Sequence, residues 1–188
     1  MRTAFVLAAL LVGLVATAAS AHAADWKSVP AGSKLEIVAS FEKTPVPGEF
    51  KKFDAALKGF DPAKPAGGSL EVVIDVTSAD LGVADVNREI RGKDWFDMAA
   101  HPKAEFRSTE VRRYGSRYVA RGTLALKGAQ QPVEVPFTWT PSGDGATMEG
   151  EFTVKRGAFG IGTGEWAATD TIGADVKVRF KVRMAKAA

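Results

Sequence analysis

The 188-residue chain contains no cysteine and only two histidines. Without cysteine, neither a disulfide framework nor thiolate chemistry is available, so stability must come from burial and backbone hydrogen bonding. His22 belongs to the leader predicted below, which leaves His101 as the single histidine of the mature chain. Zinc and copper sites need more nitrogen or sulfur ligands than that. A serine hydrolase is disfavoured too, since no Gly-x-Ser-x-Gly motif is present.

Long apolar runs are missing after the first residues. The one such run, Ala4 to Ala16, follows Arg2 and precedes the small-residue stretch that ends at Ala23. This pattern is typical of a secretory signal peptide, and the run is short for a membrane anchor. We predict a signal peptide over residues 1–23, a single mature domain over 24–188 and a periplasmic location, which suits an exported chain without cysteine.

An excess of one charge is missing as well. Removing Arg2 from the 25 Lys and Arg residues leaves 24 basic against 22 acidic side chains in the mature chain. This balance does not favour nucleic-acid binding. Basic residues gather in 107–121 and 177–186, where they would suit anionic lipid head groups or simply a solvated outer strand face. We prefer the second interpretation.

The chain is rich in alternating apolar and polar residues. Between Ala174 and Met184 every second residue is apolar, which predicts a half-buried β-strand. Val176, Val178, Phe180 and Val182 fall on its inner face. Similar patterns predict seven further strands, over residues 34–42, 50–60 (with a bulge), 70–77, 104–112, 117–126, 133–139 and 147–155.

The remaining segments are predicted as connections. We expect residues 25–33 to be an exposed start, 45–48 a proline-rich connection and 84–91 the one sizeable helix. Eight strands and one helix predict an all-β fold, either a sandwich or an eight-stranded antiparallel barrel. The lone helix favours a lipocalin-like barrel, because it can plug one end. The interior of such a barrel is either a solid core or a cavity for one small ligand.

Catalytic candidates are few. Asp94 and Asp97 lie close together beside two aromatic residues, as a carboxylate pair of a glycosidase would. The preferred interpretation is structural, with these carboxylates capping backbone N–H groups or pairing with Arg88 and Arg91. The glycine-rich run 157–164 lacks the ending of a phosphate loop, so it predicts a flexible connection whose apolar side chains cover a cavity mouth.

Several phrases resemble the YceI-like proteins, and they span nearly the whole mature chain in order. The phrases are Gly48-Glu49-Phe50 with Phe53, the run Asn87 to Asp97 followed by Pro102, Ala104, Phe106 and Ser108, then Gly122 to Gly128 with Gln131-Pro132-Val133, and Arg156 to Gly162. One departure is that many relatives carry a histidine after the first strand, whereas residues 41–47 contain none.

The resemblance implies a periplasmic, lipocalin-like, eight-stranded barrel without catalysis or cofactor. It implies that the barrel stores or transports a long isoprenoid, such as a polyprenyl phosphate or a quinone-like tail. A homodimer, and a peripheral contact with a membrane or a membrane redox protein, stay open as partners. The alternative is a modulator of a membrane redox complex with a solid or empty barrel.

The predicted ligand-binding residues are the inward apolar and aromatic side chains, with Phe159 and Trp166 expected near the mouth. They are Leu35, Ile37, Phe41, Phe50, Phe53, Leu70, Val72, Ile74, Trp95, Phe96, Phe106, Leu124, Phe137, Trp139, Phe152, Phe159, Trp166, Val178 and Phe180.

Overall fold

A computed structural model describes residues 23–187 of the chain. The predicted signal peptide therefore lies outside the described residues, except for Ala23. Within 23–187, no helix is long and apolar enough to cross a membrane. The elements are β1 (Ala24–Phe41), β2 (Thr44–Phe50), β3 (Phe53–Phe60), η1 (Pro65–Gly67), β4 (Ser69–Asp75), η2 (Val76–Ser78), β5 (Ala79–Asp80), α1 (Ala84–Glu89), β6 (Lys103–Tyr114), β7 (Arg117–Leu126), β8 (Ala129–Ser142), β9 (Gly145–Lys155), η3 (Arg156–Phe159), η4 (Gly164–Trp166) and β10 (Asp175–Lys186).

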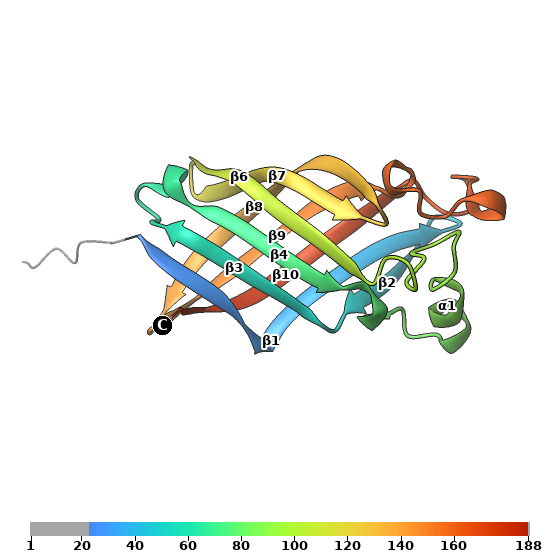
Figure 1. Cartoon of the computed structure of the whole chain (residues 1–188), viewed down its shortest axis with the longest axis horizontal. Coiled ribbons are helices and arrows are strands. Elements are labelled where there is room, and N and C mark those ends of the chain that lie inside the picture. Colours follow the sequence, from blue (N-terminus) through green and yellow to red (C-terminus); the bar gives the residue numbers. More distant parts are fainter. Residues whose placement is uncertain (1–22, 188) are drawn as a thin grey trace, which may run out of the picture.

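Eight antiparallel strands close into a barrel, as predicted. Their order is β1-β3-β4-β6-β7-β8-β9-β10, and pairing between β10 and β1 closes the ring. The short strands β2 and β5 extend the sheet beyond β1 at one end, next to α1 (Figure 1). Pairing of β10 with β1 removes the two outer edges that an open sheet of these eight strands would have.

The first strand is much longer than predicted, because residues 25–33 are part of β1 and not an exposed start. The pairing register of β1 with β10 shifts between Val29 and Lys34, and Gly32 has a φ of +82° there. A glycine tolerates this left-handed conformation, so the strand bends without ending. An irregular step of this kind breaks the two-residue apolar period, so sequence alternation does not predict this part of the strand.

The prediction of a connection over 45–48 is also wrong, because Pro45 and Pro47 lie within β2. They pair with Ser40 and Val38 of β1, and β2 meets β5 only through its last two residues. A proline has no N–H to donate, so it is tolerated on a strand with one free side. The predicted strand 50–60 is accordingly split, with β2 ending at Phe50 and β3 beginning at Phe53.

The bulge predicted in this region is present in β3. Ala24 pairs with Phe60, but Trp26 pairs with Leu57, so β3 has one residue more than β1 between these pairs. Gly59, within this step, has a φ of +56°. Elsewhere the structure has α1 over 84–89 as the one α-helix of residues 23–187, and β8 extends beyond the predicted 133–139 at both ends.

Aromatic side chains fill the end of the barrel that holds the chain termini (Figure 1). Phe60 packs at ring-centroid distances of 5.2 Å from Tyr118 and 5.1 Å from Trp139, and Trp26 lies 4.9 Å from Trp139. Edge-to-face contacts of this kind add to the burial of apolar area. This half is a solid core, so space for a ligand is left only towards the other end.

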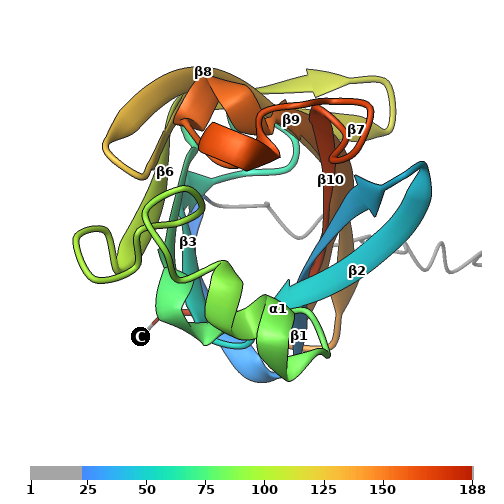
Figure 2. The same ribbon diagram turned by 90° about the vertical axis from the view of Figure 1, so that its right-hand side faces the viewer.

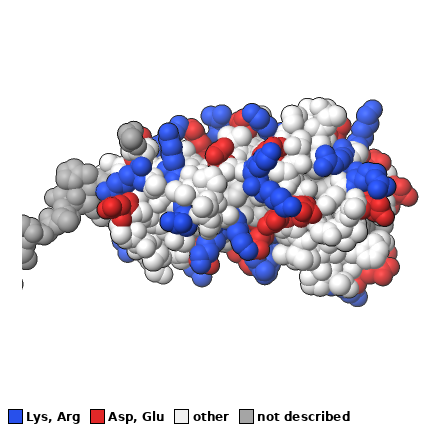
Figure 3. Space-filling view, turned by 90° about the horizontal axis from the view of Figure 1, so that it is seen from below, with Lys and Arg blue, Asp and Glu red and all other residues white. Residues whose placement is uncertain are grey.

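Charged side chains of both signs are interspersed on the outer surface, as on the face in Figure 3. Three of the five basic residues of β10 form ion pairs across the sheet: Lys177 and Arg179 with Glu151, and Lys181 with Glu149. Such exposed pairs contribute little stability. They do place these basic residues on a solvated outer face, as the alternation predicts.

Candidate functional site, an apolar cavity in the barrel

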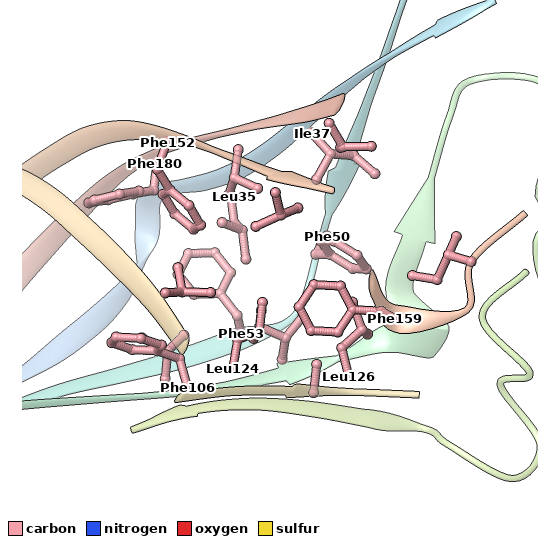
Figure 4. Close-up of a pocket in the computed structure, with 18 of the residues that line it drawn as sticks. Leu35, Ile37, Phe50, Phe53, Phe106, Leu124, Leu126, Phe152, Phe159 and Phe180 are labelled. Carbon is pink, nitrogen blue, oxygen red and sulfur yellow. The ribbon is translucent and has the colours of Figure 1, made fainter. Parts of the chain in front are cut away.

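A cavity of about 170 Å³ occupies the interior half that faces α1. The labelled side chains of Figure 4 come from strands around the barrel and, for Phe159, from η3; they point towards one another and carry only carbon. Fifteen of the nineteen predicted ligand-binding residues line it. They are Leu35, Ile37, Phe50, Phe53, Leu70, Val72, Ile74, Trp95, Phe96, Phe106, Leu124, Phe152, Phe159, Val178 and Phe180.

The other four predicted residues lie away from the cavity. Phe137 and Trp139 belong to the packed aromatic end, where Phe137 is 1% exposed. Phe41, near the tip of the β1–β2 hairpin, is 44% exposed. Trp166 packs against Trp95, at 5.7 Å between ring centroids, behind the cavity wall. Alternation tells which side of a strand faces inward, but not how far along the barrel a side chain lies.

The lining also contains residues that the predicted set lacks. Val176 and Val182 come from the inner face predicted for the last strand. The others are Ala39, Ala55, Leu81, Ile90, Ala104, Leu126, Val133, Val135, Met148, Val154, Arg156, Ile161 and Ile172. Most are small or aliphatic inward residues of the same strands, so the alternation alone could have found them.

Arg156 is the exception, since it is the one charged residue of the lining. Arg156 is 4% exposed, and its guanidinium donates to a ring of backbone carbonyls instead of a carboxylate. Nε donates to Gly173 (3.0 Å) and Nη1 to Ile161 (2.9 Å) and Gly162 (2.6 Å). Nη2 donates to the carbonyls of Trp166 (2.9 Å) and Ile172 (2.8 Å).

All five N–H groups of Arg156 therefore have acceptors within the protein. Burial lowers the pKa of the Arg156 guanidinium, but an arginine starts so high that it stays charged at ordinary pH. Because the acceptors all lie in the connection between β9 and β10, one side chain fixes that connection at the barrel end. The glycine-rich connection is thus anchored through its backbone. Phe159 and Ile161, buried by it, complete the cavity wall.

A second segment, around α1, covers the opposite side of the same end (Figure 2). It supplies Leu81, Ile90 and Phe96 to the cavity wall. Asp80 holds the start of this segment: its carboxylate accepts from Lys51, from the Asn87 side chain and from the N–H of Gly82. These donors, first the Lys51 side chain and then Asn87, hold the pKa of Asp80 well below its usual range.

Asp94 connects the two covering segments. Its backbone carbonyl accepts from the N–H groups of Gly162 (2.7 Å) and Thr163 (3.0 Å), and its carboxylate accepts from the Thr163 hydroxyl at 2.7 Å. Arg88, considered above as a partner, donates instead to Asp85. Within residues 23–187 the Asp94 carboxylate thus contacts a threonine hydroxyl, and neither of the two expected contacts, a backbone N–H cap or an arginine pair, is formed by it.

Trp95 also belongs to the cavity lining. Its Nε1 is buried and has no acceptor among residues 23–187. Within the same residues, no three His, Cys, Asp or Glu side chains come together as a metal-binding group. With the Arg156 donors occupied, the cavity offers van der Waals contact and exclusion of water. Such a lining suits a hydrocarbon chain or ring and provides no polar set that could fix a charged group inside the barrel.

The sequence profile of the YceI-like domain matches residues 26–184. A UPF0312 protein of Yersinia pestis is 33% identical over 162 residues, which cover 81% of this chain and 84% of that protein. One from Photorhabdus laumondii is 40% identical over 86 residues, 46% of this chain and 44% of that protein.

Solved structures show the same fold. The crystal structure of Burkholderia cenocepacia BcnA is 40% identical, with a TM-score of 0.80 over 83% of this chain and 98% of that one. A polyisoprenoid binding domain from Saccharophagus degradans, implicated in plant cell wall breakdown, is 17% identical, with a TM-score of 0.68 over 88% of this chain and all of that one.

Proposed function

Since this chain belongs to the YceI-like family, we propose that it is a non-catalytic binding protein that holds the apolar chain of an isoprenoid lipid inside its barrel, for storage or transport in the periplasm. The observation that carries the proposal is the cavity itself, which is lined by aliphatic and aromatic side chains from strands all around the barrel. The polyisoprenoid-binding relative of the same fold points to the same ligand class.

The energetics favour a hydrocarbon ligand. Each buried methylene contributes about 0.8 kcal/mol, so every isoprene unit that leaves water helps to offset the entropy of ordering the chain. Arg156 belongs to the cavity lining, but its N–H groups donate to backbone carbonyls of the β9–β10 connection. The interior therefore recognises the chain of the lipid, and a polar head group is expected to stay outside the barrel.

Fluorescence titration with prenyl alcohols tests this proposal directly. Trp95 is the one tryptophan of the cavity lining, so a bound chain should change its emission. We expect saturable binding of geranylgeraniol to the wild-type protein and loss of most of the emission change in Trp95→Phe. Ubiquinone should displace geranylgeraniol. A protein that binds no prenyl compound, but copurifies with a membrane redox complex in a salt-sensitive manner, would support the alternative function instead.

A further inference from the structure

The wall of the barrel has a gap between β8 and β9. The two strands pair only from Thr138 with Glu149 to Ser142 with Gly145. Beyond this, residues 129–137 of β8 continue their pairing with β7, and residues 150–155 of β9 continue theirs with β10. Within the described residues, the ladder between β8 and β9 is therefore missing along half of their length.

The sequence explains where this ladder stops. Pro132 and Pro136 have no N–H, and since the ladder of β8 with β7 is complete, their missing donors belong to the side that faces β9. Gly150 marks the last close approach of the strands, because a Cβ on it would lie 2.1 Å from the Pro136 carbonyl oxygen. Beyond Gly150 the strands separate.

An outer groove of about 530 Å³ lies over this gap. Val133, Phe152, Val154 and Phe159 line both the groove and the interior cavity, so the two spaces are separated by single side chains. Polar residues, including Gln131, Glu134 and Thr153, line the same groove. Phe152 and Val154 are partly exposed, whereas the inward residues of the paired half of β9, Ala146 and Met148, are 4% and 2% exposed.

The interior cavity is small for the proposed ligand. At about 170 Å³ it is close to a cavity of about 150 Å³ that takes up benzene, which has six carbons. Ligand pockets for larger molecules are usually about 300 Å³ or more. A chain of four or more isoprene units therefore needs space beyond this cavity, and the groove behind Phe152 and Val133 is directly adjacent.

We propose that the gap between β8 and β9 is a side portal, through which the part of a long prenyl chain that exceeds the interior cavity passes into the outer groove. This inference rests on the proposed function, since its occupant is the same lipid chain. A rotation of Phe152 joins the two spaces without breaking any strand pairing, because no β8–β9 ladder exists at that point. Such a portal would let a barrel with a solid aromatic end take up chains of different length.

Cross-linking across the gap tests the portal. The chain has no cysteine, so a double variant with Glu134→Cys and Thr153→Cys contains only the two introduced thiols. These two residues would stand opposite each other if the ladder continued, and a short bifunctional thiol reagent would hold the strands together. The matched control is Thr140→Cys with Thr147→Cys, which bridges a directly paired position of the same two strands.

The probes are prenol, whose single isoprene unit of five carbons fits the interior cavity, and geranylgeraniol, with four units. Bridging 134 to 153 should weaken geranylgeraniol binding at least about tenfold relative to the same variant before bridging, and leave prenol binding within about threefold. Bridging 140 to 147 should change neither. Unchanged geranylgeraniol binding after bridging 134 to 153, or an equal loss in the control, would overturn the portal. The proposed function would still stand. If the unmodified protein binds neither probe, the proposed function fails, and the portal fails with it.

Discussion

Gly162 lies so close to Arg156 that a Cβ atom on Gly162 would stand 2.2 Å from the Nη1 nitrogen of the guanidinium. The carbonyl of Gly162 accepts from the same nitrogen at 2.6 Å. The absence of a side chain at this position therefore makes room for the group that anchors the connection between β9 and β10. The shape of the cavity end depends on this contact.

Replacing Gly162 by alanine should displace Arg156. Gly162 has a φ of +70°, so Gly162→Ala costs backbone strain in addition to the steric clash, and we expect a loss of about 2–4 kcal/mol in the free energy of unfolding. Gly160→Ala is the matched control, because Gly160 has a φ of +63° but nothing within 4 Å of its Cβ. Urea denaturation compares the two variants, and equal losses would show that the contact with Arg156 is unimportant.

Removing the guanidinium itself should be more damaging. Arg156→Met leaves several carbonyls of the connection without a donor, and each that stays buried costs about 1–3 kcal/mol, so we expect a loss of about 3–5 kcal/mol. Arg113→Met removes an exposed arginine that donates to a single carbonyl, that of Gly115, and should cost less than about 0.5 kcal/mol. Similar unfolding midpoints for the two variants would contradict an anchoring function for Arg156.

Two Val→Thr substitutions separate binding from packing. Val178 lines the cavity, so Val178→Thr places a hydroxyl against the lipid chain and should weaken geranylgeraniol binding about tenfold while the protein stays folded. Val111 is fully buried outside the cavity lining, and Val111→Thr should lower stability by about 1–3 kcal/mol without changing the dissociation constant of the folded protein. Titration and urea denaturation of both variants check this, and weakened binding in Val111→Thr alone would refute the assigned cavity wall.

Asp80 should make stability sensitive to acid. Its pKa is lower in the folded protein than the value of about 3.9 expected in the unfolded chain, so its stabilising contribution is present above that value and is lost as the pH falls towards the folded pKa. Asp80→Asn should therefore reduce the difference in unfolding free energy between pH 7 and pH 3. Asp144→Asn, on the exposed β8–β9 turn, is the control and should keep the wild-type difference.

The sequence predicts the barrel and most of its inner wall, because apolar alternation follows directly from the pleat of a half-buried strand. It fails where local irregularity breaks that period. The first half of β1 is not predicted as a strand because the register shifts near Gly32. The strand β2 is not predicted because it contains Pro45 and Pro47.

The candidate site was predictable only in part. Phe137 and Trp139 face inward as predicted, but their depth in the barrel depends on strand stagger, which alternation does not contain. Arg156 resembles an ordinary surface residue before a glycine-rich connection. One feature of the sequence could have indicated its position. A long irregular connection that is buried has many backbone carbonyls without a partner, and a nearby arginine can donate to them.

Native mass spectrometry of the protein, gently purified from its own cells, is the decisive test of lipid binding. The measurement compares the intact mass with the mass after organic extraction and identifies what the solvent removes. We predict a fraction of protein heavier than the polypeptide by one prenyl lipid, which appears in the extract, and a smaller bound fraction in Val178→Thr. Only the polypeptide mass, with no prenyl lipid in the extract, would contradict the account.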